Sequence, residues 1–283
     1  MTTEVSQIFA QYREEFPHYL EFIETLQNIH LLRNEKAATR PRDIFTLSPV
    51  SASRKLKADQ PLINLKEELL NDPTPEQYFL ELLSLAENEH PSATAAIRET
   101  LAADKNAYRE LIRELFARET NLGETAIARI LTISTEAEEL DLIPLLLHES
   151  LKPFFTELAA NLNTVIRNSG WNQGRCPVCS RPADLSLLRE EEGKRTLFCL
   201  QCDCEWPYKR LQCPFCGEED QQKLSYFTVE DGNHDKYRVN VCHQCQRYIK
   251  TIDTRKSSSA INPEIENLVT LHLDLQAAKE GFK

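Results

Sequence analysis

The sequence is poor in glycine, contains no long apolar run, and carries charge mostly of one sign. With only seven glycines among 283 residues, glycine-rich loops that cradle phosphates are not expected. No stretch approaches the roughly twenty uncharged apolar residues that span a bilayer, so we expect no membrane insertion. The net charge of −11 argues against a general affinity for nucleic acid phosphates or anionic membrane surfaces.

Targeting signals and familiar catalytic motifs are missing as well. The first segment, MTTEVSQIFAQYREEF, has no basic start and no apolar core, which predicts a cytoplasmic protein without a signal peptide. There is no P-loop, no H-E-x-x-H and no glycine-rich dinucleotide turn. Acidic pairs such as Glu138/Glu139 are typical of solvated charge. We therefore predict no catalytic residues and no enzyme activity.

Cysteine is absent from the first 175 residues and is then concentrated in one segment. Eight of the nine cysteines form four Cys-x-x-Cys pairs: Cys176/Cys179, Cys199/Cys202, Cys213/Cys216 and Cys242/Cys245. Two residues between two thiolates let one tight turn present both sulfurs to a metal ion, and a tetrahedral site needs two such turns. The four pairs therefore predict two metal ions, each bound by four cysteines.

The lengths between the pairs favour a sequential grouping. Nineteen residues separate Cys179 from Cys199, which leaves room for a hairpin that brings the first two pairs together. Twenty-five residues separate Cys216 from Cys242, with the same consequence, whereas only ten lie between the second and third pairs. We expect one site from the first two pairs and another from the last two. An interleaved grouping is the alternative.

The spacing leaves the metal and its role open, since four thiolates suit iron and zinc alike. Structural sites are favoured, because such small modules would gain much of their folding free energy from metal binding. The alternatives are a rubredoxin-like iron site that carries electrons, a redox-active dithiol and a zinc-ribbon module for protein interactions. Nucleic acid is not favoured as a partner, because residues 171–254 contain twelve Lys and Arg against thirteen Asp and Glu.

Residues beside the pairs carry further expectations. We call the tight turn of a Cys-x-x-Cys pair a knuckle. The residue after its second cysteine often has positive φ, a conformation that costs glycine the least free energy. Of these four positions only Gly217 is glycine, and the other three hold Ser180, Asp203 and Gln246. We expect His243 to face solvent rather than to bind metal. The ninth cysteine, Cys204, is expected to be buried beside Trp206, with a spare ligand or a reactive thiol as the alternative.

The distribution of residue types along the chain predicts a multi-domain α plus small β protein. Residues 1–170 predict an all-helical domain with a linker over residues 36–61 and a helical pattern over residues 124–140. Its last helix is expected to break or kink at Pro153 and to stop at Gly170.

The rest of the chain predicts small β modules and a final helix. Residues 171–206 and 207–254 predict two tandem zinc-ribbon or rubredoxin-like modules, because short alternating runs there indicate β-hairpins. Residues 255–283 predict a C-terminal helix that docks back on the body and ends at Gly281. Its apolar face is expected to consist of Ile265, Leu268, Leu271, Leu275 and Ala278.

Several segments carry a specific resemblance. They are GWNQGRCPVCSRPADLSLL, GKRTLFCLQCDCEWPYKRLQCPFCG, KLSYFTVEDG, YRVNVCHQCQRYIKTID and the Leu-rich NLVTLHLDLQAAKEGF. From about Trp171 to Phe282 the chain resembles the formate dehydrogenase accessory protein family, FdhE. Before Trp171 the similarity is only architectural. The chain departs from the family at Ser180, where Gly is usual, and at Cys204, where Thr is common.

The resemblance implies a cytoplasmic maturation factor with a helical N-terminal domain and two rubredoxin-like metal sites, bound by the eight paired cysteines. It implies binding to the catalytic subunit of a respiratory formate dehydrogenase, a molybdenum or tungsten enzyme with an Fe–S cluster. Such subunits are usually exported by the twin-arginine route, so the factor would act in assembly or activation before export. Whether the chain forms a homodimer is left open.

Overall fold

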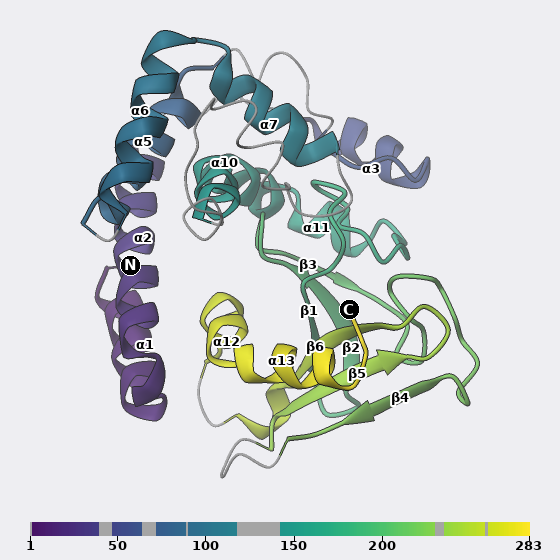
Figure 1. Cartoon of the computed structure of the whole chain (residues 1–283). Helices are drawn as coiled ribbons and strands as arrows, with labels where there is room; N and C mark the ends of the chain where they lie inside the picture. Colours follow the sequence, from purple (N-terminus) through teal and green to yellow (C-terminus); the bar gives the residue numbers. More distant parts are fainter. Residues whose placement is uncertain are drawn as a thin grey trace. The chain divides into compact units, whose positions relative to one another are not determined.

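The structure, a computed structural model, describes residues 2–39, 47–63, 72–88, 90–117, 142–229, 235–257 and 260–283 (Figure 1). The chain divides into two compact units. Unit 1 comprises Met1–Gln27, Leu47–Leu62 and Ala159–Lys283, and unit 2 comprises Asn28–Thr46 and Ile63–Leu158. The helix expected over residues 124–140 lies outside the described residues. The division expected at residues 170, 206 and 254 stays a prediction.

The first half of the chain is helical, as predicted. Its described helices are α1 (Thr2–Glu15), the 3₁₀ turn η1 (Pro17–Tyr19), α2 (Leu20–Thr39), α3 (Pro49–Lys57), α5 (Thr74–Ala86), α6 (Pro91–Ala103), α7 (Ala107–Ala117), α10 (Leu142–Asn161) and α11 (Asn163–Arg167). In unit 2, α5 buries Tyr78 and Leu82 on one face. A buried ion pair of 2.6 Å joins Arg33 of α2 to Glu149 of α10. No described helix is long and apolar enough to cross a membrane.

The expected linker and the expected break at Pro153 are wrong, while a kink at Pro153 stays a prediction. The expected linker contains helix α3, whose N-cap Ser48 accepts a hydrogen bond from the backbone N–H of Ser51 while Pro49 occupies the first turn. The Ser-Pro pair is therefore a helix start. Helix α10 also continues through Pro153 without a break. The buried Phe155 and its neighbours anchor the helix there, which offsets the roughly 3 kcal/mol cost of an interior proline.

Unit 1 is built on one sheet. Within the described residues its strands are β1 (Leu185–Arg189), β2 (Lys194–Cys199), β3 (Cys204–Pro207), β4 (Leu224–Phe227), β5 (Tyr237–Cys242) and β6 (Arg247–Asp253). Their order is β3-β2-β1-β6-β5-β4. The first three strands and the last three form two antiparallel groups. The groups join where β1 runs parallel to β6, with Leu185 opposite Lys250.

The apolar core of unit 1 lies on one face of this sheet. Helices α12 (Pro263–Val269) and α13 (Leu271–Lys279), the yellow helices in Figure 1, lie across that face, and α1 contributes residues to the same core. Alternate strand residues point into the core because side chains in a strand alternate between faces. The buried members of the core are Phe9, Tyr12, Phe16, Ile23, Leu185, Leu187, Phe198, Tyr237, Val239, Val241, Ile252, Ile265, Val269, Leu273, Ala277 and Phe282.

The C-terminal segment forms two helices where one was expected. Thr270 separates them, because its hydroxyl donates to the carbonyl oxygen of Glu266 at 2.7 Å and its backbone leaves the helical conformation. The buried residues fall at every fourth position through both helices, at Ile265, Val269, Leu273 and Ala277, so the expected Leu275 is 65% exposed. Gly281, with φ of +87°, ends the second helix as predicted.

A buried carboxylate ties three elements of unit 1 together. Glu266 of α12 is fully buried and accepts hydrogen bonds from the hydroxyl of Tyr12 at 2.6 Å and from the hydroxyl of Tyr237. Lys236 donates to the same carboxylate at 3.1 Å. Burial and the negative charge of Glu266 raise the pKa of both tyrosines, so they stay protonated donors at neutral pH. The carboxylate thus joins α1, β5 and α12.

Replacing Glu266 with alanine is expected to lower the free energy of unfolding by about 3 kcal/mol, because three buried donors lose their shared acceptor. Urea unfolding followed by circular dichroism measures this change. Glu280→Ala, at the exposed C-cap of α13, is the matched control and should cost less than about 0.5 kcal/mol. Equal effects of the two substitutions would contradict the role assigned to Glu266.

Candidate metal centres

Two groups of four cysteines come together in unit 1. One consists of Cys176, Cys179, Cys199 and Cys202, and the other of Cys213, Cys216, Cys242 and Cys245. Within each group the four sulfur atoms all lie within 4.8 Å of one another, so each could hold a metal ion. We call them the first and second clusters. The sequential grouping predicted from the spacing is confirmed.

Each cluster joins a knuckle in a loop to a knuckle at the tip of a hairpin. In the first cluster the loop knuckle precedes β1, while Cys199 ends β2 and Cys202 lies in the turn before β3. In the second, Cys242 ends β5 and Cys245 lies in the turn before β6. The expected hairpins, β1–β2 and β4–β5, occupy the two long gaps between knuckles.

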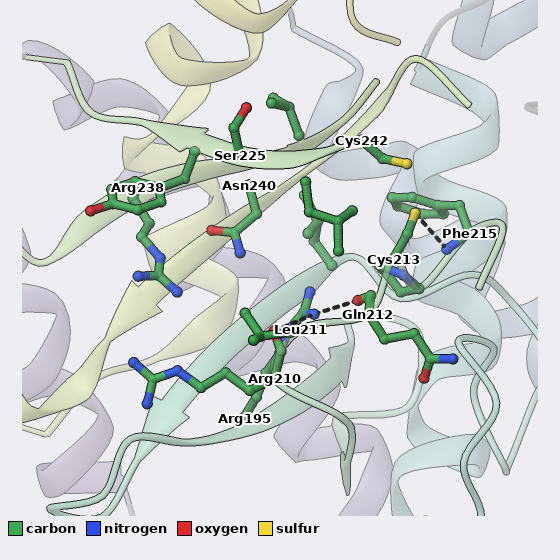
Figure 2. Close-up of a pocket in the computed structure, with 15 residues that line it drawn as sticks. Arg195, Arg210, Leu211, Gln212, Cys213, Phe215, Ser225, Arg238, Asn240 and Cys242 are labelled. Atoms are coloured by element: carbon green, nitrogen blue, oxygen red, sulfur yellow. Dashed lines mark hydrogen bonds between the residues drawn. The ribbon is translucent and has the colours of Figure 1, made fainter. Parts of the chain in front are cut away.

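The loop knuckles owe their shape to proline and to backbone hydrogen bonds. In the second cluster, Pro214 follows the first cysteine and fixes the φ angle of a tight turn. The N–H of Gly217 then donates to the carbonyl oxygen of Cys213 at 3.0 Å. The N–H of Phe215 donates to the sulfur of the same cysteine at 3.4 Å, as the dashed line in Figure 2 shows. The first loop knuckle forms the same bonds at the same lengths.

The sulfur atoms are spaced as a tetrahedral metal site requires. With metal–sulfur bonds of about 2.3 Å, the edges of such a tetrahedron are about 3.8 Å long. In the second cluster the Cys213–Cys245 and Cys216–Cys242 sulfur pairs are each 3.7 Å apart. In the first cluster the closest sulfur pairs lie 3.3 to 4.0 Å apart. Four thiolates at this spacing fit a zinc or iron ion.

The two clusters differ in burial. All four cysteines of the first are buried, whereas in the second Cys216 is exposed and Cys245 is half-buried. Burial raises the pKa of Cys199 to about 11, so without metal this thiol is protonated at neutral pH. A metal ion held by the first cluster would therefore have to replace protons on buried thiols. The second cluster meets solvent directly.

Comparison with known proteins bears on the same part of the chain. Residues 211–283 match the family model described as FdhE, C-terminal domain. The predicted resemblance to the FdhE family is thereby confirmed. An FdhE homologue of Aquifex aeolicus is 31% identical over 145 residues, 50% of each chain. One of Pseudomonas aeruginosa is 32% identical over 116 residues, 38% of this chain and 36% of that protein. The chain thus aligns with half or less of these relatives.

A solved structure matches over nearly the full length. The crystal structure of the FdhE protein from Pseudomonas aeruginosa superposes with a TM-score of 0.71, covering 99% of this chain and 91% of that one. The sequences are 19% identical, so the match establishes a shared fold. It agrees with the predicted order of a helical part, a β part with the cysteines, and a helical C-terminal end, although one terminal helix was predicted and two are present.

The chain departs from the FdhE pattern at Ser180, and the backbone at that position has a conformation that favours glycine. The residue after the second cysteine has positive φ in all four knuckles: 66° at Ser180, 51° at Asp203, 77° at Gly217 and 56° at Gln246. The expected left-handed turn therefore forms with or without glycine. For a residue with a Cβ this conformation costs about 1 kcal/mol.

The remaining polar candidates lie beside the clusters rather than in them. His243 is exposed and its Nε2 is 2.9 Å from the hydroxyl of Ser225, which agrees with the expectation that it is no ligand. Cys204 is buried, as is Trp206 two residues later on β3. It lies opposite Cys199 in the sheet and outside the two groups of four, but its thiol contacts the sulfurs of Cys176 and Cys202 in the first cluster. The expected burial of Cys204 is therefore confirmed, while its alternative role as a spare ligand or a reactive thiol stays a prediction.

The two loop knuckles approach each other at a glycine that the sequence did not single out. A Cβ at Gly174 would lie 1.6 Å from the carbonyl oxygen of Pro214, so any side chain there would force the segments apart. The indole of Trp206 donates to the carbonyl oxygen of Gln173 at 3.0 Å and fixes the same approach. The segment before the first cluster thus packs directly on the second.

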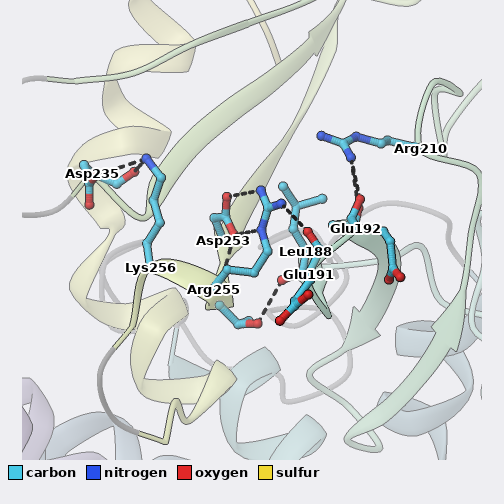
Figure 3. A network of polar contacts seen from close by, with 10 residues as sticks. Leu188, Glu191, Glu192, Arg210, Asp235, Asp253, Arg255 and Lys256 are labelled. Atoms are coloured by element: carbon cyan, nitrogen blue, oxygen red, sulfur yellow. Dashed lines mark hydrogen bonds and ion pairs between the residues drawn. The ribbon is translucent and has the colours of Figure 1, made fainter.

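A polar network also fastens the end of β6 to the β1–β2 turn (Figure 3). The Arg255 guanidinium bonds both oxygens of Asp253, at 2.7 and 2.6 Å, and donates to the carbonyl oxygen of Glu191 at 3.1 Å. Arg210 donates to the carbonyl oxygen of Glu192 at 3.0 Å. These bonds fasten the β1–β2 turn to the end of β6 and to the loop that follows β3.

Ser180→Gly is expected to raise the free energy of unfolding by about 0.5–1 kcal/mol, because glycine relieves the cost of the left-handed turn. Thermal or urea unfolding of the full chain measures the change. Ser180→Ala is the matched control, since it removes the hydroxyl but keeps the Cβ, and it should give no gain. Stabilisation by both substitutions would show that the hydroxyl, not the backbone, is responsible.

Proposed function

We propose that the chain is an accessory factor for a respiratory formate dehydrogenase. In this role it binds the catalytic subunit in the cytoplasm and supports its assembly or activation before export, as a binding protein rather than an enzyme. The observation that carries the proposal is the pair of four-cysteine clusters in a chain whose residues 211–283 match the FdhE C-terminal domain. The shared fold with an FdhE protein over nearly the whole chain supports the same role.

The eight clustered cysteines are proposed as the metal ligands. Support comes from the sulfur spacing, which suits a tetrahedral ion in both clusters. A bound ion would supply a cross-link between a loop knuckle and a hairpin knuckle. The chain's own backbone N–H groups, such as that of Phe215, donate to the sulfurs and stabilise their negative charge. The sheet then presents a rigid surface to a partner.

The net charge of the chain affects how it binds the subunit that it would assist. A net charge of −11 favours contact with basic elements of an immature subunit, including a twin-arginine segment. Such contacts are screened by salt. Binding that is weaker at high ionic strength is therefore part of the proposal.

A chelator is expected to remove metal from the purified chain in two phases. The second cluster should empty first, because Cys216 is exposed while the first cluster is fully buried. A colorimetric metal indicator measures the release, and total metal analysis should give two ions per chain. Cys213→Ser should remove the fast phase and Cys176→Ser the slow one.

Cys204→Ser is the matched control for this experiment, since Cys204 is buried but belongs to neither group of four. It should retain both ions and both phases. Loss of an ion in this variant, or release in a single phase from the unchanged chain, would contradict the assignment of ligands.

An electron-carrying role is the second candidate, and the exposure of Cys216 favours it at the second cluster. An iron–thiolate site there would give the purified chain a visible absorption band, which zinc does not produce. Full maturation activity with zinc in both clusters would exclude this role and leave the clusters structural.

Co-purification tests the proposed client. The tagged chain should capture the catalytic subunit of a formate dehydrogenase from cells that produce both, and the yield should fall as salt is raised. A double variant, Cys176→Ser with Cys213→Ser, should lose the client because the sheet surface loosens, whereas Cys204→Ser should retain it. Capture of a different stable partner, without any formate dehydrogenase subunit, would favour an unrelated interaction module.

A further inference from the structure

The sheet of unit 1 has a pocket on the face opposite its apolar core (Figure 2). Val239 points into the core, and its neighbours Arg238 and Asn240 line the pocket because strand residues alternate between faces. The pocket has a volume of about 300 Å³. Strands β4 and β5 form one wall, and the loop from Arg210 to Phe215, which includes the second cluster's first knuckle, forms the other.

Three arginines line this pocket, and none has a carboxylate partner among the described residues. Arg195 is 5% exposed and donates to the Ser186 hydroxyl and to backbone carbonyl oxygens of the loop, at 2.8 Å for Gln212. Arg210 likewise donates only to carbonyl oxygens. Arg238 lies over the ring of Tyr226 at 4.9 Å. In a chain with a net charge of −11, such a group of unmatched cations is unusual.

The pocket also contains polar atoms that the protein leaves unsatisfied. Within the described residues, Nε of Arg238 and Oδ1 of Asn240 are buried and have no hydrogen-bond partner. The buried hydroxyl of Thr251, directly opposite Arg238 in the sheet, has none either. Buried polar groups in proteins are almost always paired. Burial is the main cause that lowers the pKa of Arg238, and the positive charge of Arg210 lowers it further, while Tyr226 and Asp253 act in the opposite direction.

Apolar groups stand next to these cations. Leu211 and Tyr226 line the pocket and are 55% and 61% exposed, so they form an apolar rim at its mouth. Phe215 and Ile249 line its interior. A ligand that fits must therefore place a negative oxygen pair at the arginines and an apolar body against the rim.

We propose that this pocket binds a carboxylate carried on an apolar body. A guanidinium presents two parallel N–H groups that match the two oxygens of a carboxylate. A single charge suits the apolar surroundings better than a phosphate, which brings a charge of about −1.5 to −2 into the same space. The carboxylate has two sources, a free small molecule or an acidic side chain in a protein segment that also carries apolar residues.

The test is a calorimetric titration of the purified full chain, as isolated, with benzoate at low ionic strength. Saturable binding of one benzoate per chain is expected. Arg238→Gln should weaken it about tenfold or more, because a charge-assisted hydrogen bond is lost. Arg54→Gln, which removes the same charge at an exposed position on α3, is the matched control and should bind normally.

A second variant keeps the test decisive if Arg238→Gln does not fold. Asn240→Asp places a carboxylate of the chain's own beside Arg238, so the fold should be retained and benzoate binding lost. Two peptides, acetyl-Gly-Leu-Glu-Leu-Gly-amide and its glutamine counterpart, distinguish the sources. Binding of the glutamate peptide alone assigns a protein segment, and binding of benzoate alone assigns a small molecule. Either outcome supports the site, provided that Arg238→Gln weakens the binding that is observed.

Three results would overturn the proposal. The first is that neither benzoate nor the glutamate peptide binds to the unchanged chain. The second is that inorganic phosphate binds while no carboxylate does. The third is that Arg54→Gln weakens binding as much as Arg238→Gln, which would reduce the effect to net charge. None of these outcomes depends on a formate dehydrogenase client, so the pocket and the proposed function stand or fall separately.

Discussion

The constraint on which unit 1 depends is that four sulfur atoms must meet within a few ångströms at two places in one sheet. Meeting this constraint requires tight knuckles with left-handed residues, seen at Ser180 and Gln246. It also requires hairpins that return the chain, which β1–β2 and β4–β5 provide. The close approach at Gly174 follows from the same geometry, because two knuckles share the space beside one sheet.

Local spacing predicted the site well because the ligands are close in sequence. Two intervening residues determine that Cys176 and Cys179 share a turn, and the gap lengths favoured the grouping now observed. The fold was predictable only in outline. Nothing local indicates that β1 pairs with β6, since that parallel pairing joins residues far apart in the chain. Thr270 likewise breaks a helix through a hydroxyl contact that apolar periodicity does not register.

The two faces of the sheet in unit 1 carry different kinds of side chain and have different roles. One face carries the apolar core and the buried Glu266, which hold α1, α12 and α13 in place. The other carries unmatched arginines and unsatisfied polar atoms next to the second cluster. Strand alternation is sufficient to produce this division, since Arg238 and Val239 are neighbours in sequence. Sequence reasoning missed the arginines because no motif marks them and their separation along the chain is large.

The parallel pairing of β1 with β6 has a consequence for how the chain is made. On the ribosome β1 emerges before β6 and can pair with β2 at once, whereas its other edge must wait until Asp253 at the end of β6 has been synthesised. Until then a nascent chain exposes an unpaired strand rich in leucine, the kind of edge that recruits other strands. The first cluster can therefore be complete while its sheet is still open to aggregation.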